Sequence, residues 1–249
     1  MNLKRDTYAI VDLDHLKYNV ELAHSEFKRP LMAVIKADAY GHGYKEVASF
    51  LKDIDYIEMF AVATLQEAIE LRELGINKGI LILGAIPTSK EDIDLAIKYD
   101  ISLTMVSVAY LKLLDHLIDK GQTLKVHIKL DTGMHRIGLM SKDELSTLLE
   151  LIDPNKFDVE GIFTHFATAD GDIEAFEKQR GARRTAVAAF RLRNCLSPLL
   201  SVRPPCRTDR RCPIYAPYAD LLHQHLQEVS KDRLPCRRCQ SGSSRRQPD

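Results

Sequence analysis

The chain has 249 residues, of which 45% are apolar and 28% are charged, and its formal net charge is zero. The apolar fraction is ordinary for a globular protein, which excludes a wholly disordered chain, a collagen and a coiled coil. No run approaches the roughly 18 uncharged apolar residues of a membrane helix, and the polar start Met1–Asp6 is not typical of a signal peptide. We therefore expect no membrane partner.

The zero net charge hides two unlike segments. Residues 1–179 contain 20 basic and 30 acidic side chains and no cysteine, whereas residues 180–249 contain 15 basic and 5 acidic side chains and all five cysteines. We expect one folded domain over 1–179 and a distinct Arg-, Cys- and Pro-rich segment over 180–249. The lack of cysteine in the first segment fits a reducing compartment, so a cytoplasmic protein is expected.

Six short apolar runs, rich in β-branched residues, are the predicted strands of the first segment. They are Leu31–Ile35, Met59–Ala63, Ile80–Leu83, Ile101–Val106, Lys125–Leu130 and Val159–Phe163. Segments of helical period separate them, and strand–helix units at this spacing predict a parallel sheet.

The predicted helices between these strands are recognised by their apolar faces and their ends. Apolar residues at helical spacing are Val47, Phe50, Leu51 and Ile54; Ile93, Ala96 and Ile97; Leu111, Leu114 and Ile118; and Leu145, Leu148, Leu149 and Ile152. Ser89-x-x-Asp92 and Ser141-x-x-Glu144 are expected to begin two of these helices, the second as a capping box. Lys120-Gly121 is expected to end the helix that carries Leu114.

Two architectures fit this order, an open doubly wound sheet and a (β/α)8 barrel. A nucleotide-binding sheet should carry G-x-G-x-x-G or a P-loop after its first strand, and neither is present. A barrel needs eight units, and six are legible. We therefore expect an α/β fold of the (β/α)8 TIM-barrel type that is incomplete at its C-terminal end.

The segment Ala33-Val-Ile-Lys-Ala-Asp-Ala-Tyr-Gly-His-Gly43 is the first candidate for chemistry. A buried-looking strand ends in Lys36 and leads into a loop with two glycines. The carboxyl ends of parallel strands face the active site. Partial desolvation there would lower the pKa of a lysine and make its amine a Schiff-base nucleophile. The alternative is that Lys36 only extends its ammonium group from the strand end into solvent.

The fifth predicted strand and its loop are the second candidate. His127, Lys129 and Asp131 alternate with apolar residues, so they share one face, which in a barrel points at the lumen. Arg136 follows between glycines and could clamp a carboxylate or a phenolate oxygen. The alternative is a solvated edge strand. His165 ends the sixth strand, where a lone histidine is by itself more typical of a structural residue.

Together these segments resemble the bacterial alanine racemases. The Lys36 segment is similar to the attachment segment for pyridoxal phosphate in that family. Lys129-Leu-Asp-Thr-Gly-Met-His-Arg-Ile-Gly138 and Phe163-Thr-His-Phe-Ala-Thr-Ala-Asp170 are similar to its next two signatures, in the same order, and Tyr8-Ala-Ile-Val-Asp-Leu-Asp14 resembles its opening strand. The resemblance covers residues 1 to about 179. It implies a pyridoxal-phosphate barrel, a following β domain and a head-to-tail homodimer.

The resemblance also implies roles for five residues of this chain. Lys36 would form the internal aldimine with pyridoxal 5'-phosphate and act as the base on one face of the substrate. Tyr40 would bind the cofactor phosphate, and His165 would lie near the pyridine ring. Arg136 would contact the cofactor's phenolic oxygen and the substrate. Lys129 matches a lysine that is often carbamylated in the family, and as a carbamate it would orient Arg136.

After Gln179 the family pattern is not recognised in the sequence. The family's partners for the phosphate and the pyridine nitrogen are not found, and neither Tyr215 nor Tyr218 can be assigned as its second-face tyrosine base. A frameshift near codon 180 is our hypothesis for the changed composition. A lone Cys236-x-x-Cys239 is too weak to predict a metal site, and basic charge without interleaved aromatics predicts no specific nucleic-acid binding.

The predicted function is an alanine racemase that interconverts L- and D-alanine for peptidoglycan precursors, with its activity impaired in this chain. The alternative is a non-catalytic pyridoxal-phosphate-binding barrel or an inactive truncated product. An amino-acid decarboxylase of the same barrel type is a third option, but the lysine segment of those enzymes lacks the Tyr40-Gly-His-Gly43 continuation. Dimerisation, which the family implies, is doubtful for this chain.

Overall fold

The computed structural model describes residues 9–87, 89–167 and 173–182. Its strands are β1 (Leu31–Val34), β2 (Ile57–Val62), β3 (Gly79–Ile82), β4 (Leu103–Met105), β5 (Leu124–Leu130) and β6 (Phe157–Thr164). Its helices are α1 (Leu13–Phe27), α2 (Lys36–Gly41), α3 (Tyr44–Leu51), α4 (Leu65–Glu73), α5 (Lys90–Lys98), α6 (Val108–Leu117) and α7 (Lys142–Leu151), followed by a helix over 173–182. All six predicted strands are confirmed. Within the described ranges, no helix is long and apolar enough to cross a bilayer.

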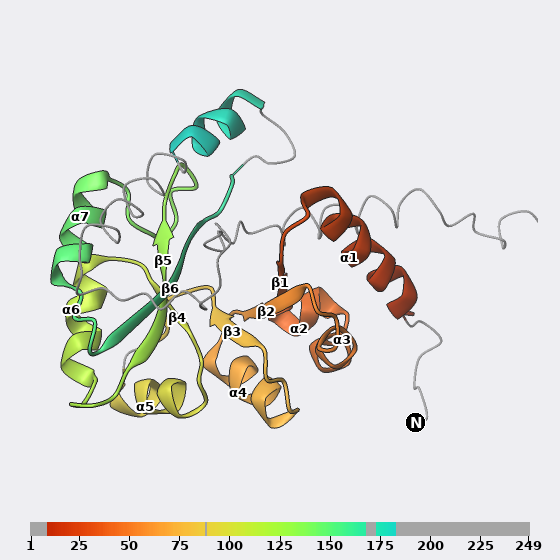
Figure 1. Cartoon of the computed structure of the whole chain (residues 1–249), viewed down its shortest axis with the longest axis horizontal. Coiled ribbons are helices and arrows are strands. Elements are labelled where there is room, and N and C mark those ends of the chain that lie inside the picture. The colour runs from red at the N-terminus through yellow and green to blue at the C-terminus, as the bar shows by residue number, and fades with distance from the viewer. Residues whose placement is uncertain (1–8, 88, 168–172, 183–249) are drawn as a thin grey trace, which may run out of the picture.

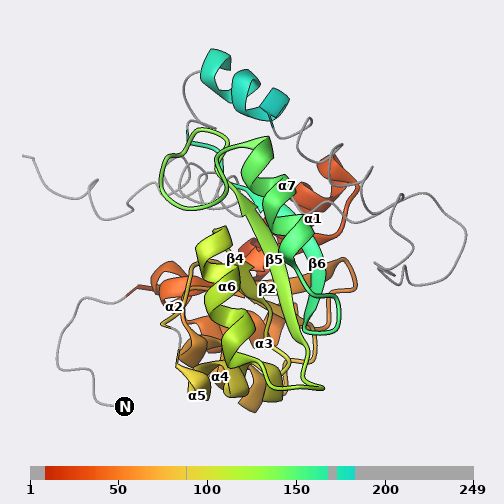
Figure 2. The same ribbon diagram turned by 90° about the vertical axis from the view of Figure 1, so that its left-hand side faces the viewer.

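The strands form a parallel arc in chain order. One sheet has the order β1-β2-β3 and the other β4-β5-β6, and every pair is parallel. A bridge between Leu81 and Ser102 joins the two sheets, and the Ile82 N–H donates to the Ser102 carbonyl at 2.9 Å. Helices α3 to α7 lie on the outer side of the arc, whereas the helix over 173–182 lies beyond one end of the strands (Figures 1 and 2). This is the strand–helix arrangement of a (β/α) barrel, with six units described.

The two faces of the arc differ in composition. On the outer face, side chains such as those of Phe60, Ile80 and Ile128 are fully buried in one large core beneath the helices. On the inner face, Met59, Leu81 and Phe163 form a second, smaller apolar cluster. Alternation along each strand produces this division, because successive side chains point to opposite faces of a sheet.

The expected opening strand over Tyr8–Asp14 is wrong for the residues that the structure describes, since 9–12 lie outside any strand and α1 begins at Leu13. The Asp12 carboxylate accepts hydrogen bonds from the N–H groups of Asp14 and His15, at 2.9 and 3.1 Å. This residue therefore acts as the N-cap of a helix, which satisfies donors that a strand would direct elsewhere.

Most of the predicted helix ends are confirmed. Ser141 and Glu144 form the predicted capping box of α7, and Ser89 caps α5. The predicted end of α6 at Lys120-Gly121 is wrong, because that helix ends at Leu117. Ile118 is already extended and only 4% exposed, so burial of its side chain ends the helix. Gly121, at φ +90°, belongs to the following turn.

Candidate active site

Lys36 lies directly beyond the carboxyl end of β1. The Ile35 N–H still bonds to the Ala61 carbonyl at 2.9 Å, and Lys36 is the first residue beyond that bond. Its side chain is half-buried, and its Nζ lies 5.8 Å from the centre of the Tyr40 ring. The predicted location of the lysine at a strand end is confirmed, and the two residues from the first motif are neighbours.

A left-handed turn brings Tyr40 back to Lys36. The four residues of 37–40 all have φ between 50° and 57°. Such a conformation costs roughly 1–2 kcal/mol for each L-residue, so the surrounding bonds must hold it. The Ala39 N–H donates to the Ile35 carbonyl at 3.0 Å, and the Asp38 carboxylate accepts from the Tyr44 N–H at 3.0 Å. The turn therefore fixes the phenol beside the amine.

A carboxylate from α4 also holds this turn. Glu67 accepts a hydrogen bond from the Ala37 N–H at 2.8 Å, and it belongs to a capping box with Thr64 at the start of α4. Glu67 was not predicted from the sequence, although the pattern Thr64-x-x-Glu67 is a recognisable signal for a helix start.

His127 and Lys129 are buried on the inner face of β5, with 1% and 2% of their surfaces exposed. Because β5 lies between β4 and β6, the interpretation as a solvated edge strand is wrong. His127 Nε2 lies 3.5 Å from Glu160 Oε2, and that carboxylate also accepts from Ser102 Oγ at 2.5 Å. His127 therefore belongs to a polar cluster with Ser102, which directly precedes β4, and with Glu160 in β6.

Lys129 is a buried amine. Its Nζ donates to the Leu130 carbonyl at 2.8 Å and lies 5.6 Å from the centre of the Phe163 ring. Burial is the main cause that lowers the pKa of Lys129 to about 8; the charge of Asp131 opposes this shift, and the charge of Arg136 adds to it. Within the described residues, no carboxylate forms an ion pair with this amine. Part of its population is thus neutral near physiological pH.

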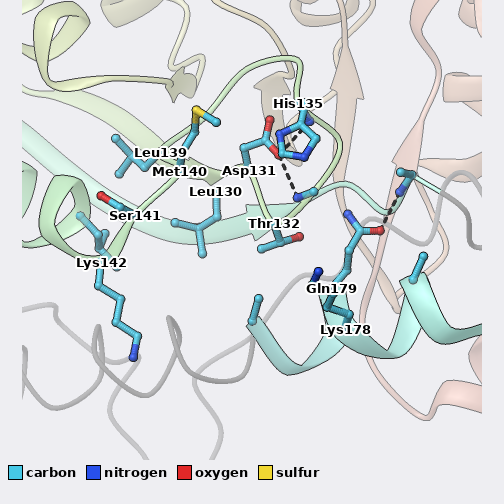
Figure 3. Close-up of a pocket in the computed structure, with 15 residues that line it drawn as sticks. Leu130, Asp131, Thr132, His135, Leu139, Met140, Ser141, Lys142, Lys178 and Gln179 are labelled. Carbon is cyan, nitrogen blue, oxygen red and sulfur yellow. Dashed lines mark hydrogen bonds between the residues drawn. The ribbon is translucent and has the colours of Figure 1, made fainter.

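Asp131 does not stay on the inner face with His127 and Lys129, since β5 ends at Leu130. Its carboxylate turns into the following loop and accepts from the N–H groups of Gly133 and His135, both at 2.9 Å (Figure 3). It also accepts from the Arg136 N–H at 2.8 Å. Burial alone would raise the pKa of Asp131, but these hydrogen bonds and the charge of Lys129 hold it below its usual value. The loop that carries the exposed Arg136 is thus organised by one carboxylate.

The ends of β5 and β6 are joined by hydroxyl groups. Thr164 Oγ1 donates to the Leu130 carbonyl at 2.9 Å and lies 2.8 Å from Thr132 Oγ1. His165, the next residue, is half-buried at the carboxyl end of β6. Gln179 reaches from the helix over 173–182 toward the same loops and accepts from the Ala167 N–H at 2.9 Å (Figure 3). His165 therefore follows a strand end that contacts the loop of Arg136.

A pocket of about 680 Å³ lies between the loop after β5, the start of α7 and the helix over 173–182 (Figure 3). Asp131 lines this pocket, but Lys36, Tyr40 and Lys129 do not. The predicted site residues lie instead at the carboxyl ends of three strands: β1 for Lys36 and Tyr40, β5 for Lys129 and Arg136, and β6 for His165. Within the described ranges, no cluster of three or more His, Cys, Asp or Glu could hold a metal ion.

Some predicted features fall outside the described residues. These are Cys236, Cys239, Tyr215, Tyr218 and the final barrel units expected after Gln179. What the described part offers is an amine, a phenol, a guanidinium and an imidazole at one end of a parallel barrel. That set can attach a carbonyl compound and bind anionic groups on it.

Comparison with known proteins identifies relatives of this arrangement. The profile of the family "Alanine racemase, N-terminal domain" matches residues 11–203, which extends beyond the boundary near 179 that the motifs indicate. The chain is 40% identical over 181 residues to the alanine racemase of Streptococcus equi, covering 72% of this chain and 48% of that protein. It is 42% identical over 180 residues to alanine racemase 1 of Bacillus subtilis, covering 71% and 44%.

Solved structures give the same result. An alanine racemase of Clostridium difficile, in complex with cycloserine, has a TM-score of 0.70 and 34% identity, covering 78% of this chain and 54% of that one. An alanine racemase of Bacillus anthracis with bound L-Ala-P also has a TM-score of 0.70, at 30% identity, covering 87% and 57%. The chain spans about half the length of the relatives that it matches.

Proposed function

Because the chain belongs to the alanine racemase family, we propose that it binds pyridoxal 5'-phosphate on Lys36 and acts on the two enantiomers of alanine. One observation carries the proposal: Lys36 stands at the carboxyl end of β1 with the Tyr40 phenol returned to its side by the left-handed turn. An amine and a phenol held together in this way fit an aldehyde that carries a phosphate group.

The bound cofactor would supply the electron withdrawal that makes the proton on the α-carbon of alanine removable. Lys36 would take and return this proton on one face of the substrate. The Tyr40 hydroxyl would donate to the phosphate, and the Arg136 guanidinium would bind the phenolic oxygen and the substrate. His165, at the end of β6, would lie against the pyridine ring. Alanine is the proposed substrate because the relatives are named as alanine racemases.

We also propose that Lys129 is carbamylated. With a pKa of about 8, roughly a tenth of the amine is neutral at pH 7, and only the neutral amine adds to carbon dioxide. The new N–C bond forms as the nitrogen loses a proton, and a carbamate anion replaces a buried cation. That anion would face the positive charge of Arg136, which lowers the pKa of the unmodified Lys129. A buried charge is tolerated when it is paired in this way.

The wider setting of the function is inferred from the same likeness. D-Alanine produced by this reaction would supply peptidoglycan precursors. The absence of cysteine from residues 1–179 supports a reducing, cytoplasmic location. A homodimer and a division into a barrel over 1–179 and a separate segment over 180–249 remain predictions.

Trapping of the cofactor tests the central assignment. The purified chain is incubated with pyridoxal 5'-phosphate and reduced with borohydride, and its peptides are mapped by mass spectrometry. We expect the label on Lys36 and no label in Lys36→Ala. Lys45→Ala is a matched control, since Lys45 lies nearby but pairs with Glu70 at 2.9 Å. A label on Lys45 or Lys129 instead would refute the assignment.

A further inference from the structure

Two helices of this chain begin with the same capping box. In α4 the Thr64 hydroxyl accepts from the Glu67 N–H, and Glu67 Oε2 accepts from the N–H groups of Ala63 and Thr64, at 2.8 and 3.1 Å. In α7 the Ser141 hydroxyl and Glu144 Oε2 make the equivalent bonds. In both boxes one carboxylate oxygen, Oε2, completes the cap.

The two boxes differ in what the second carboxylate oxygen does. Glu67 Oε1 accepts from the Ala37 N–H at 2.8 Å, a bond that leaves α4 and crosses to the segment after β1. Within the described residues, Glu144 makes its bonds through Oε2 alone. Glu67 therefore makes a hydrogen bond beyond those of its cap. Within the described residues, the capping box of α7 has no equivalent of that bond.

That bond involves the residue next to Lys36. Ala37 is the first of the four left-handed residues, with φ 51° and ψ 54°, and its conformation determines the direction in which the chain leaves Lys36. Gly is absent from 37–40, so the turn has no residue that adopts positive φ without cost. An external acceptor for the first N–H of the turn stabilises this conformation directly.

The acceptor itself is well anchored. Ala68 and Leu71, on the same helix, are fully buried in the main core, which holds α4 against the sheet. The capping bonds then fix the Glu67 side chain at the start of that helix. A hydrogen bond to a charged acceptor is among the stronger kinds in proteins.

We propose that Glu67 is a positioning residue for Lys36: its second carboxylate oxygen holds the left-handed turn and thereby aims the lysine amine and the Tyr40 phenol at the same site. The proposal rests on the proposed function insofar as Lys36 is taken as the cofactor lysine. The bond to Ala37 can be tested without that assumption.

The substitution Glu67→Gln separates the two tasks of Glu67. Glutamine is accepted at this position of a capping box, but it offers a single acceptor oxygen, so it cannot bond to both the cap and Ala37. Glu144→Gln is the matched control, because it makes the same change where only the cap is at stake. Both variants should melt within a few degrees of each other.

Two measurements should set the variants apart. Hydrogen exchange of the Ala37 amide, followed by NMR, should become about tenfold faster in Glu67→Gln and stay unchanged in Glu144→Gln. Borohydride trapping of pyridoxal 5'-phosphate on Lys36 should become about tenfold slower in Glu67→Gln alone. Neither change is expected of a residue that only caps a helix.

Thr64→Ala provides a further variant, since it weakens the cap of α4 and keeps the bond from Ala37 to Glu67. Equal effects of Thr64→Ala and Glu67→Gln on Ala37 exchange and on trapping would overturn the proposal, as would equal effects of Glu67→Gln and Glu144→Gln. Rapid exchange of the Ala37 amide in the unaltered chain would overturn it without any variant. Failure to trap the cofactor in the unaltered chain, with Ala37 protected, would refute the proposed function instead.

Discussion

Lys129 is unusual for a lysine because its amine is buried. Its amine is nearly inaccessible on the inner face of β5, and its hydrogen bond goes to a carbonyl rather than to a carboxylate. Burial lowers the pKa of Lys129 from 10.5 to about 8. The folded chain therefore binds this proton less tightly than the unfolded chain does.

The pH dependence of stability follows from that difference. Below about pH 8 Lys129 is protonated in both the folded and the unfolded state, and the buried charge destabilises the folded state. Between about pH 8 and 10.5 Lys129 is neutral in the folded state and still protonated in the unfolded state. The free energy of unfolding therefore rises with pH across this window. Relative to Lys129→Met, the unaltered chain should gain about 3 kcal/mol across that window. Urea unfolding of both, in buffer free of carbon dioxide, measures the gain.

Lys142→Met serves as the control, because Lys142 is exposed at the start of α7. The free energy of unfolding of Lys142→Met should change with pH in the same way as that of the unaltered chain. Parallel profiles for Lys129→Met as well would contradict the low pKa of Lys129.

At the scale of single residues, the sequence predicts the polar residues at strand ends better than it predicts the hydrogen bonds that hold them in place. Lys36 and Lys129 were recognisable because each breaks or ends an apolar strand. The role of Glu67 was not, because its partner Ala37 lies 30 residues away and donates a backbone N–H. Asp131 was assigned to the inner face by alternation, yet three N–H groups of the next loop draw its carboxylate away from that face.

The loop between β5 and α7 is the element that presents Arg136. Its returning part pairs with the strand, since the Leu139 N–H donates to the Lys129 carbonyl at 2.9 Å and the Asp131 N–H donates to the Leu139 carbonyl at 2.8 Å. Gly138, just before this pairing, has φ +118°, and a Cβ there would lie 2.9 Å from the Asp131 nitrogen and from Lys129 Cγ. The close return of the loop thus requires glycine.

Gly138→Ala should accordingly displace the loop and destabilise the chain by about 2–4 kcal/mol, through backbone strain together with overlap against the strand. Gly84→Ala is its control, because a Cβ at Gly84 meets no atom within 4 Å. That substitution should change the free energy of unfolding by no more than about 0.5 kcal/mol. Equal losses in urea unfolding for the two variants would contradict this account of the loop.

The elements that the sequence predicted correctly are those fixed by local patterns. The six strands follow from runs of apolar residues, and the start of α7 follows from its capping box. The left-handed turn over 37–40 was not predicted, because Asp adopts this conformation only as a single residue and Ala and Tyr rarely do. Hydrogen bonds to Ile35 and Glu67 stabilise it instead. The end of α6 was misplaced for a related reason, since burial of Ile118 overrides the glycine signal at Gly121.

At the scale of the whole molecule, the described residues correspond to part of the family's barrel. Within the described residues the arc is open between β6 and β1, and the chain spans about half the length of its relatives. Every site residue that could be placed belongs to this half. The second-face tyrosine that the resemblance implies belongs to a β domain outside the matched part, so Lys36 is the one base that the resemblance assigns among the described residues.

If Lys36 is the only base that acts on the substrate, the proposed function predicts exchange of the α-proton without inversion. Under the proposed function, Lys36 would remove the α-proton of alanine and return one from solvent to the same face, which would exchange the proton without changing the configuration. Inversion requires a proton on the other face, and loss of a positioned general acid or base typically costs about 10²–10⁴-fold in rate. In deuterated water with pyridoxal 5'-phosphate, the 249-residue chain should therefore exchange the α-proton of one alanine enantiomer much faster than it interconverts the two.

Proton NMR of the alanine α-position measures the exchange, and chiral chromatography of the same samples measures inversion. Lys36→Ala should abolish the exchange, which separates it from catalysis by free cofactor. A non-catalytic cofactor-binding barrel, the alternative function, would trap the cofactor on Lys36 and show no exchange above that of Lys36→Ala. Inversion as fast as exchange would mean that a second base acts on the opposite face, and the prediction of exchange without inversion would then be wrong.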